Sequence, residues 1–198
     1  LRRPKDPPPR DRRISDDEIE LILSALNFPF FFEVEDSSNQ PPDLEVTEQR
    51  HKTAIAFLLA IETAMRQGEM CKIAWADVHL ETRHIFLPHT NTKTREPRKI
   101  PLSTKAVRLI NLLPKGEPYE LMLGIKPGVV STMFRRARIK ANIEDLTFHD
   151  SRHEACTRLA QILPTPFDLA KVSGHRDMNQ ILNTYYNRDA SELAQYLP

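Results

Sequence analysis

Long apolar segments are missing from this chain, and cysteines are few. No apolar run approaches the ~20 residues that a membrane-spanning helix needs. The first residues are rich in arginine and proline and lack the apolar region of a secretory signal peptide. The two cysteines, Cys71 and Cys156, lie among apolar residues in helical patterns, which predicts buried free thiols and a reducing compartment. The sequence therefore excludes a membrane-spanning protein and favours the cell interior.

Net charge is also nearly absent, because 28 basic residues face 27 acidic ones, but the charges are unevenly distributed. Residues 14–50 carry ten acidic side chains and one basic one, whereas residues 83–108 carry seven basic side chains and one acidic one. A further basic cluster lies at residues 135–140. This distribution is compatible with a polyanion-binding face opposite an acidic back, and equally with ordinary solvated faces, so charge alone does not decide.

The chain divides into a short linker and one domain. Residues 1–13 hold six basic side chains and four prolines, which predicts an extended basic linker. In residues 14–198, helical patterns occupy 15–26, a segment ending at residue 64, and then 69–74, 103–112, 131–141, 147–162 and 166–174. Residues 84–87 and 99–102 predict two paired strands. The expected fold is mainly α with a small antiparallel β-sheet.

Two segments place arginine where a phosphate can be bound. Arg66 follows an apolar helix and precedes Gly68, so its guanidinium can be held at the rim of the core, and Glu69 can support it through a charge-assisted hydrogen bond. His149 and Arg152 are three residues apart at a helix start, where they share a face and where the helix end favours an anion. The alternative for Arg66 is a plain surface ion pair with Glu69.

A metal site is the competing interpretation of the histidines. His149 and His153 are four residues apart, and His175 is available as a third ligand. However, no carboxylate stands at the spacing of a zinc-protease motif, because Glu154 follows His153 and no histidine lies three residues beyond it. The sequence therefore disfavours a metal and predicts that His153 is a packed or hydrogen-bonded structural histidine.

Three further positions complete the chemistry. Lys93 lies in a threonine-rich hairpin between the expected strands, where it can protonate a leaving oxygen or merely contact a DNA backbone. His175 follows Gly174 at a helix end, where a capping role is the alternative. A late tyrosine, Tyr185 or Tyr186, offers a hydroxyl that can act as a covalent nucleophile.

Taken in chain order, these residues resemble the tyrosine recombinases, the phage integrase family of DNA breaking and joining enzymes. The resemblance covers roughly residue 14 to the C-terminus and fills every catalytic position of the family. It implies Arg66, Lys93, His149, Arg152, His175 and Tyr185 as catalytic residues, with Glu69 in support. The tyrosine common in the family stands nine residues after the histidine, whereas Tyr185 and Tyr186 stand ten and eleven after His175, and the register of the preceding helix favours Tyr185.

The resemblance implies site-specific recombination or integration through a 3′-phosphotyrosine, with no metal, cofactor or ATP. Lys93 is expected to act as the general acid for the 5′-hydroxyl. A type IB topoisomerase-like or telomere-resolving enzyme, a metal-dependent nuclease, and a DNA-binding regulator without catalysis are the alternatives.

The partners implied are double-stranded DNA and further recombinase protomers in a tetrameric synapse, with no membrane and no small-molecule substrate. A core-binding domain is expected upstream of the linker, outside this chain, and the expected setting is the cytoplasm of a bacterial host carrying a phage or mobile element. The expected DNA contacts are Arg12, Arg13, Thr92, Thr94, Arg95, Arg98, Arg135, Arg136, Arg138 and Arg176.

Overall fold

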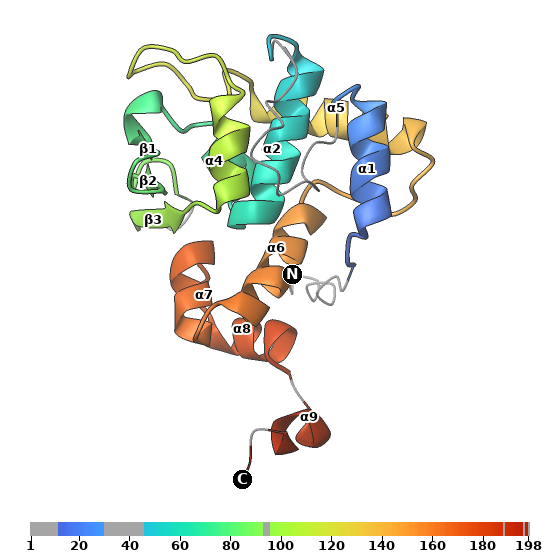
Figure 1. Ribbon diagram of the computed structural model, residues 1–198, viewed down its shortest axis with the longest axis vertical. Coiled ribbons are helices and arrows are strands. Elements are labelled where there is room, and N and C mark those ends of the chain that lie inside the picture. Colours follow the sequence, from blue (N-terminus) through green and yellow to red (C-terminus); the bar gives the residue numbers. More distant parts are fainter. Residues whose placement is uncertain (1–11, 30–45, 93–95, 188, 196, 198) are drawn as a thin grey trace, which may run out of the picture.

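The computed structural model describes residues 12–29, 46–92, 96–187, 189–195 and 197. They form a mainly helical fold with one small antiparallel sheet at its side, and the predicted fold class is thus confirmed (Figure 1). The elements are α1 (Asp16–Ala25), α2 (Gln49–Thr63), α3 (Gln67–Met70), a 3₁₀ turn (Trp75–Asp77), β1 (Val78–His79), β2 (His84–Leu87), β3 (Arg98–Pro101), α4 (Thr104–Asn111), α5 (Pro127–Lys140), α6 (Asp150–Ile162), α7 (Pro166–Ser173), α8 (Met178–Tyr185) and α9 (Ala190–Ala194). None of the described helices is long and apolar enough to cross a membrane.

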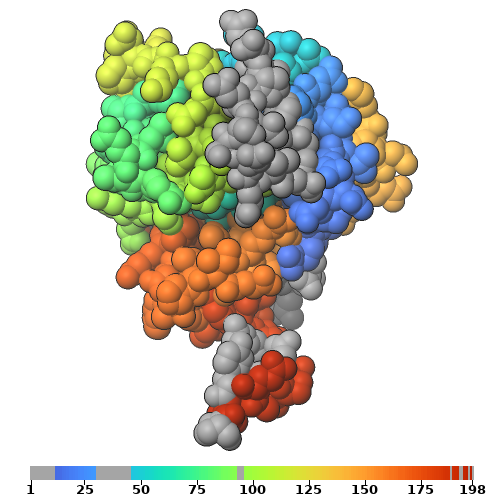
Figure 2. Space-filling view, viewed as in Figure 1, coloured from blue at the N-terminus to red at the C-terminus, as the bar shows by residue number. Residues whose placement is uncertain are grey.

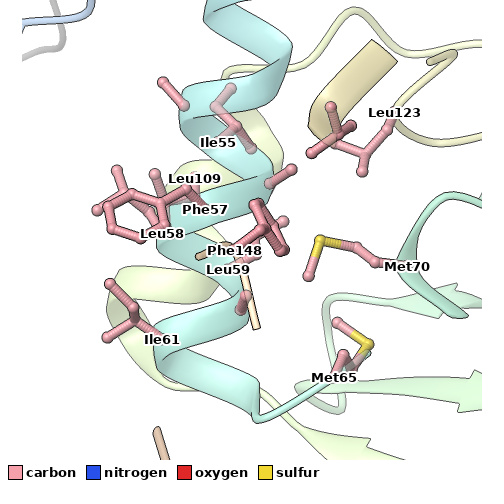
Figure 3. Close-up of a cluster of buried hydrophobic side chains, with 14 of the residues drawn as sticks. Ile55, Phe57, Leu58, Leu59, Ile61, Met65, Met70, Leu109, Leu123 and Phe148 are labelled. Atoms are coloured by element: carbon pink, nitrogen blue, oxygen red, sulfur yellow. The ribbon is translucent and has the colours of Figure 1, made fainter. Parts of the chain in front are cut away.

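Helix α2 is the centre of the fold. Its sequence is apolar on nearly all sides, which is the pattern of a helix enclosed by others. Helices α4, α5 and α6 pack around it, and Figure 3 shows Phe57, Leu58 and Leu59 of α2 among the surrounding core side chains. This enclosure fixes the end of α2, from which the next segment of chain departs.

The turn after α2 is tight. Ala64 adopts a left-handed backbone conformation with φ of 55°, which is uncommon for a residue with a Cβ atom. Arg66 then stands in extended conformation as the N-cap residue of α3. The predicted helix at 69–74 is therefore shorter and earlier, because the backbone amide at Arg66 and the carboxylate of Glu69 start the helix at residue 67.

The sheet has the order β1-β2-β3 with antiparallel pairing throughout. Leu87 pairs with Arg98, so the second predicted strand begins one residue earlier than the pattern indicated. Residues 88–97 join β2 to β3, and Lys93, Thr94 and Arg95 of this loop lie outside the described residues. The basic helix α5 also begins earlier than predicted, at Pro127, because proline is well suited to the first turn of a helix.

Helices α6, α7 and α8 form one end of the molecule. Figure 1 shows α7 and α8 below β3 and the lower end of α2, with α6 rising from them towards α2, and Figure 2 shows their orange and red surface as a continuous layer. A second apolar cluster joins them to the end of α2 through Ala64, Cys156, Leu169 and Ile181. Helix α9 stands apart from this layer in Figure 1.

Candidate active site

Glu69 is the buried anion of the site. Its side chain is 3% exposed, and it accepts hydrogen bonds from the Arg66 backbone amide and from Nη1 of Arg66, both at 3.0 Å. The ion pair expected from the spacing of Arg66 and Glu69 is thus present, and it holds the partly exposed Arg66 guanidinium at the rim of the core. Arg66 is thereby pre-positioned at the end of α2.

Arg98 binds the same carboxylate from β3. Its Nη1 and Nη2 lie 3.2 and 2.7 Å from the two Glu69 oxygens, and its Nε donates to the Val172 carbonyl of α7 at 3.2 Å. Burial alone would raise the pKa of Glu69, but the hydrogen bonds and charge of Arg98, followed by those of Arg66, lower it below its usual value. Arg98, which is expected to contact DNA, thus forms an internal ion pair with Glu69 in this structure, and its DNA contact stays a prediction.

Gly174 packs directly against Arg98. A Cβ atom at this position would lie 2.9 Å from the Arg98 Cζ, and the backbone φ is +72°. Both the contact and the left-handed conformation require glycine here. Arg98 and Gly174 together hold the end of α7 against the Arg66–Glu69 segment, and this contact positions His175, the next residue in the chain.

Arg152 lies at the centre of the site, on α6. It is 4% exposed and donates through Nη1 to the carbonyl of Ala64, while its Nη2 lies 3.4 Å from Nε2 of His175. Within the described residues, no carboxylate forms an ion pair with it. Burial lowers the pKa of its guanidinium to about 10, so the group is still charged at neutral pH. A buried cation without an ion-pair partner favours binding of an anion.

His175 is oriented by Ser173. The Ser173 hydroxyl donates to the Leu169 carbonyl at 2.6 Å, so it accepts from Nδ1 of His175 at 2.7 Å. We therefore assign the proton to Nδ1, which leaves the lone pair of Nε2 facing Arg152. Burial, followed by the positive charges of Arg152 and Arg66, lowers the pKa of His175 to about 4. The imidazole is therefore neutral at physiological pH in this structure.

His149 is the N-cap residue of α6, one turn before His153. Its side chain is open to solvent, yet partial desolvation, followed by the charge of Arg152, lowers the pKa of its imidazole. His149, Arg66 and Arg152 line a small cavity of about 50 Å³ between the start of α3 and the start of α6. Four of the groups expected to bind phosphate thus lie together: Arg66, His149 and Arg152 around the cavity, and His175 in contact with Arg152.

Tyr185 is the tyrosine whose hydroxyl enters this site. It is the last residue of α8, and its Oη lies 3.2 Å from Nδ1 of His153. Its ring centroid is 5.4 Å from that of His153 and 6.2 Å from that of His175. Burial, followed by contact with Cys156, raises the pKa of the Tyr185 phenol. Tyr186 is the residue that caps α8, and its ring packs on the apolar cluster.

Two site residues were missed by sequence reasoning. His153, predicted to be structural, contacts the Tyr185 hydroxyl, and Ser173 contacts His175. The position of His153 directly after Arg152, one turn beyond His149, was the available signal. Ser173 offered no such signal, because its role depends on how the end of α7 folds back.

The expected DNA contacts differ in their surroundings. Arg135 and Arg136 are exposed on α5, and Arg135 and Arg138 line a groove of about 410 Å³ that reaches His149. Thr92 is buried. Four of the expected contacts are arginines that pair with carboxylates in this structure: Arg12 with Glu18, Arg13 with Glu154 at 2.7 Å, Arg98 with Glu69 at 2.7 Å, and Arg176 with Glu96 at 3.1 Å.

The described part of the chain holds no group of three metal-binding side chains arranged around a common point. In particular, Nε2 of His175 faces a guanidinium, and Nδ1 of His153 faces a phenol. The site instead combines two guanidiniums, imidazoles and a hydroxyl. That combination is suited to binding a tetrahedral anion and presenting a nucleophile to it.

Comparisons with known proteins agree with this description. The profile of the phage integrase family matches residues 13–192. A putative integrase/recombinase of Haemophilus influenzae is 35% identical over 196 residues, covering 98% of this chain and 59% of that protein. A shufflon-specific DNA recombinase of Escherichia coli is 35% identical over 144 residues, covering 72% of this chain and 36% of that protein. The chain thus spans little more than half, or less, of these curated relatives.

Solved structures share the fold. The Tn1549 transposon integrase in complex with transposon right-end DNA has a TM-score of 0.73 at 21% identity, covering 98% of this chain and 67% of that one. The catalytic domain of bacteriophage HP1 integrase has a TM-score of 0.61 at 18% identity, covering 93% of this chain and 94% of that one. The architecture around the site is therefore that of a known catalytic domain.

Proposed function

The chain belongs to the phage integrase family, and from this premise we propose that it cleaves and rejoins DNA at a specific site through a 3′-phosphotyrosine. The observation that carries the proposal is that one site holds both the Tyr185 hydroxyl and Arg152, a buried guanidinium that lacks an ion pair among the described residues. Arg152 contacts His175, whose ring lies 6.2 Å from that of Tyr185. The reaction requires a nucleophile, which α8 supplies as Tyr185, and a phosphate-binding group, which α6 supplies as Arg152.

In the proposed reaction, the Tyr185 oxygen attacks the scissile phosphorus in line. Arg66, Arg152, His149 and His175 stabilise the charge that develops on the non-bridging oxygens. The bond from phosphorus to the 5′-oxygen breaks, and Lys93 protonates that oxygen. The 3′-phosphotyrosine retains the energy of the broken bond, so a 5′-hydroxyl from a second strand reverses the step without ATP or metal.

Double-stranded DNA is the proposed substrate, with the groove between α5 and His149 as its path towards the site. Arg135 and Arg138 line that groove, and Arg136 extends the basic surface of α5. Each such side chain neutralises a phosphate and releases a counterion. Strand exchange needs further protomers on the same DNA, so we propose a tetrameric synapse in the cytoplasm of a bacterial host.

The test is trapping of the covalent intermediate. A nicked suicide substrate carrying the protein's own attachment site is incubated with the protein, and the adduct is mapped by mass spectrometry. We expect an adduct on Tyr185, none with Tyr185→Phe, and nearly normal formation with Tyr186→Phe. An adduct on Tyr186 contradicts the assignment of the nucleophile. Relaxation of supercoiled DNA without the site indicates a topoisomerase-like enzyme instead.

Two additions separate the roles of metal and lysine. Cleavage is expected to persist in excess EDTA, because guanidiniums supply the positive charge, and loss that zinc or magnesium restores contradicts the metal-free mechanism. Lys93→Ala is expected to cleave a substrate whose bridging 5′-oxygen is replaced by sulfur almost as fast as the parent protein, because a thiolate leaves without protonation. Equal defects on both substrates show that Lys93 is not the proton donor.

A further inference from the structure

A cavity of about 760 Å³ lies outside the proposed active site, between the segment that follows α3 and the loop that leads into α5. None of the described residues proposed to act in catalysis lines it. Backbone hydrogen bonds fix its walls, because the Trp75 amide donates to the Glu120 carbonyl at 3.0 Å and the Met122 amide donates to the Ile73 carbonyl at 2.8 Å. A cavity of this size with fixed walls is suited to binding a ligand or part of a partner.

The lining of this cavity is both apolar and basic. Trp75, Met122 and Ile125 supply apolar side chains. Four lysines from separate parts of the chain also line it, and none of them forms an ion pair within the described residues: Lys52, Lys72, Lys115 and Lys126. Among the described lining residues Glu120 is the one carboxylate, and it accepts a hydrogen bond from the Glu117 amide at 2.8 Å. The occupant that fits this lysine-lined cavity combines acidic groups with an apolar side chain, whereas a DNA phosphate supplies only negative charge.

Helix α1 carries this combination on an exposed side. Leu21 is 48% exposed, and Asp17 lies one turn before it and three residues before Glu20, so the three side chains share one side of the helix. Both carboxylates are exposed, and neither forms an ion pair within the part of the chain that the structure describes. Two other acidic residues of α1 are bound by arginines. This side of α1 therefore offers an apolar group beside two uncompensated negative charges.

We propose that the lysine-lined cavity receives α1 of a second copy of this chain, with Leu21 inside it and with Asp17 and Glu20 paired with its lysines. This inference rests on the proposed function, because strand exchange needs several protomers on one DNA. Figure 1 shows α1 and the loop of residues 113–126 on opposite sides of α2, so one copy cannot fill its own cavity. The contact is therefore head-to-tail, and its repetition closes into a ring when the rotation between copies fits.

The contact involves one side of a single helix, so it is small. Contacts of this size are weak between free proteins, and they gain strength when a shared DNA holds the two copies side by side. The contact is therefore expected to show itself as cooperative binding of the protein to neighbouring half-sites.

Charge reversal on each side of the contact is the test. The helix variant carries Asp17→Lys and Glu20→Lys, and the cavity variant carries Lys72→Glu and Lys126→Glu. Cooperativity is measured as the ratio of the affinities for DNA with two half-sites of the attachment site and DNA with one. We expect each variant to lower this ratio by about fivefold or more, because like charges then face each other across the contact. A combined variant with both sides reversed should regain most of the parent ratio. Arg108→Glu, an exposed charge reversal on α4, is the control and should leave the ratio unchanged.

Rescue by the combined variant distinguishes a contact between copies from a role in folding or in DNA binding, because reversing the charges of α1 restores neither of those. A parent that binds two half-sites without cooperativity overturns the inference. So does a cavity variant that binds a single half-site more weakly with an unchanged ratio, because its lysines then bind DNA. Melting temperatures confirm that each variant is folded.

Adduct formation on the nicked suicide substrate, measured in parallel, separates this inference from the proposed function. A parent that binds cooperatively, with rescue in the combined variant, but forms no adduct overturns the proposed function and leaves the contact between copies in place. A parent that forms adducts, with no rescue by the combined variant, overturns the contact alone.

Discussion

Helix α6 carries two buried charges that are two residues apart and are treated in opposite ways. Glu154 is bound by Arg13 at 2.7 Å, by Arg158 at 2.7 Å and by the backbone amide of Ile14 at 3.1 Å. Arg152 has a backbone carbonyl and an imidazole for neighbours, and no carboxylate pairs with it in the described part of the chain. The charge of Glu154 is thus compensated by partners within the fold, whereas the charge of Arg152 has no such partner among the described residues and is available to bind an anion.

The pKa values express the same contrast. Burial would raise the pKa of Glu154, but hydrogen bonds from Arg13 and Arg158 lower it to about 2, so its ionised form stabilises the folded protein. Burial lowers the pKa of Arg152 to about 10, so its ionised form costs stability. We infer that Glu154 serves the fold, whereas Arg152 is retained for an anion that offsets its desolvation.

The largest expected effect is on cleavage by Arg152→Met. Removing one group that stabilises the transition state typically lowers the rate by ~10²–10³-fold, and we expect at least this loss. Because the methionine is neutral and fills a similar volume, thermal stability should stay the same or rise. Adduct formation at saturating DNA and the melting temperature measure the two effects. Arg108→Met, on the exposed face of α4, is the control. Clear destabilisation by Arg152→Met would contradict the inference that the Arg152 charge costs stability while the Glu154 charge provides it.

Glu154→Gln should show the reverse pattern. We expect the free energy of unfolding to fall by roughly 2 kcal/mol, the scale of hydrogen bonds to a buried charge, with cleavage per folded molecule nearly unchanged. The Glu154 carboxylate contributes its stability above about pH 4.5 and loses it as pH falls from there towards 2, because its folded-state pKa is lowered.

Denaturation measured between pH 7 and pH 3 checks this assignment. The parent should lose stability faster than Glu154→Gln over the acidic range, so the difference between the two proteins narrows. Glu81→Gln, at an exposed turn, serves as the matched control and should follow the parent curve. A constant difference at all pH values would show that Glu154 acts through packing and not through its charge.

Sequence reasoning succeeded where a feature is local. The Arg66–Glu69 ion pair spans three residues, and the enclosed helix α2 is visible in its apolar composition, so both followed from the chain alone. The internal partners of Arg98 were not foreseen, because Glu69 and Val172 lie 29 and 74 residues away. A basic residue in a basic segment looks like a DNA contact in the sequence, because a carboxylate partner far away along the chain becomes visible only in the folded structure.

Distance along the sequence also explains why the partner of one linker arginine was not foreseen. Arg12 and Arg13 belong to a segment with many arginines and prolines, and composition alone indicates a solvated polyanion contact. Glu18 lies six residues from Arg12, but Glu154 lies 141 residues from Arg13. The pairing of Arg13 is therefore a property of tertiary structure, which no pattern in the linker encodes.

Arg98 tests whether charges that stabilise the fold can be separated from charges that serve the site. Its side chain is 9% exposed, against 1% for Glu154, and it supports the site through Glu69 and through the end of α7. We expect Arg98→Met to lower stability by about 1–2 kcal/mol and cleavage by on the order of tenfold, because Arg66 still pairs with Glu69. Lys99→Met, exposed on the same strand, is the control. A loss of stability with fully retained cleavage would place Arg98 with Glu154 as a purely structural residue.

The smallest expected effect is on the salt dependence of DNA binding, which should differ between arginines paired with a carboxylate and exposed arginines. An arginine that contacts a phosphate contributes about 0.9 to the slope of log affinity against log salt concentration. Arg135 is exposed on α5, so Arg135→Ala should reduce this slope by nearly one unit. Arg12 is engaged by Glu18, so Arg12→Ala should change the slope by much less. Titrations of labelled DNA at several salt concentrations measure both slopes. Equal changes would show that the Arg12–Glu18 pair opens when DNA binds, and that the fold compensates this charge only until its anion arrives.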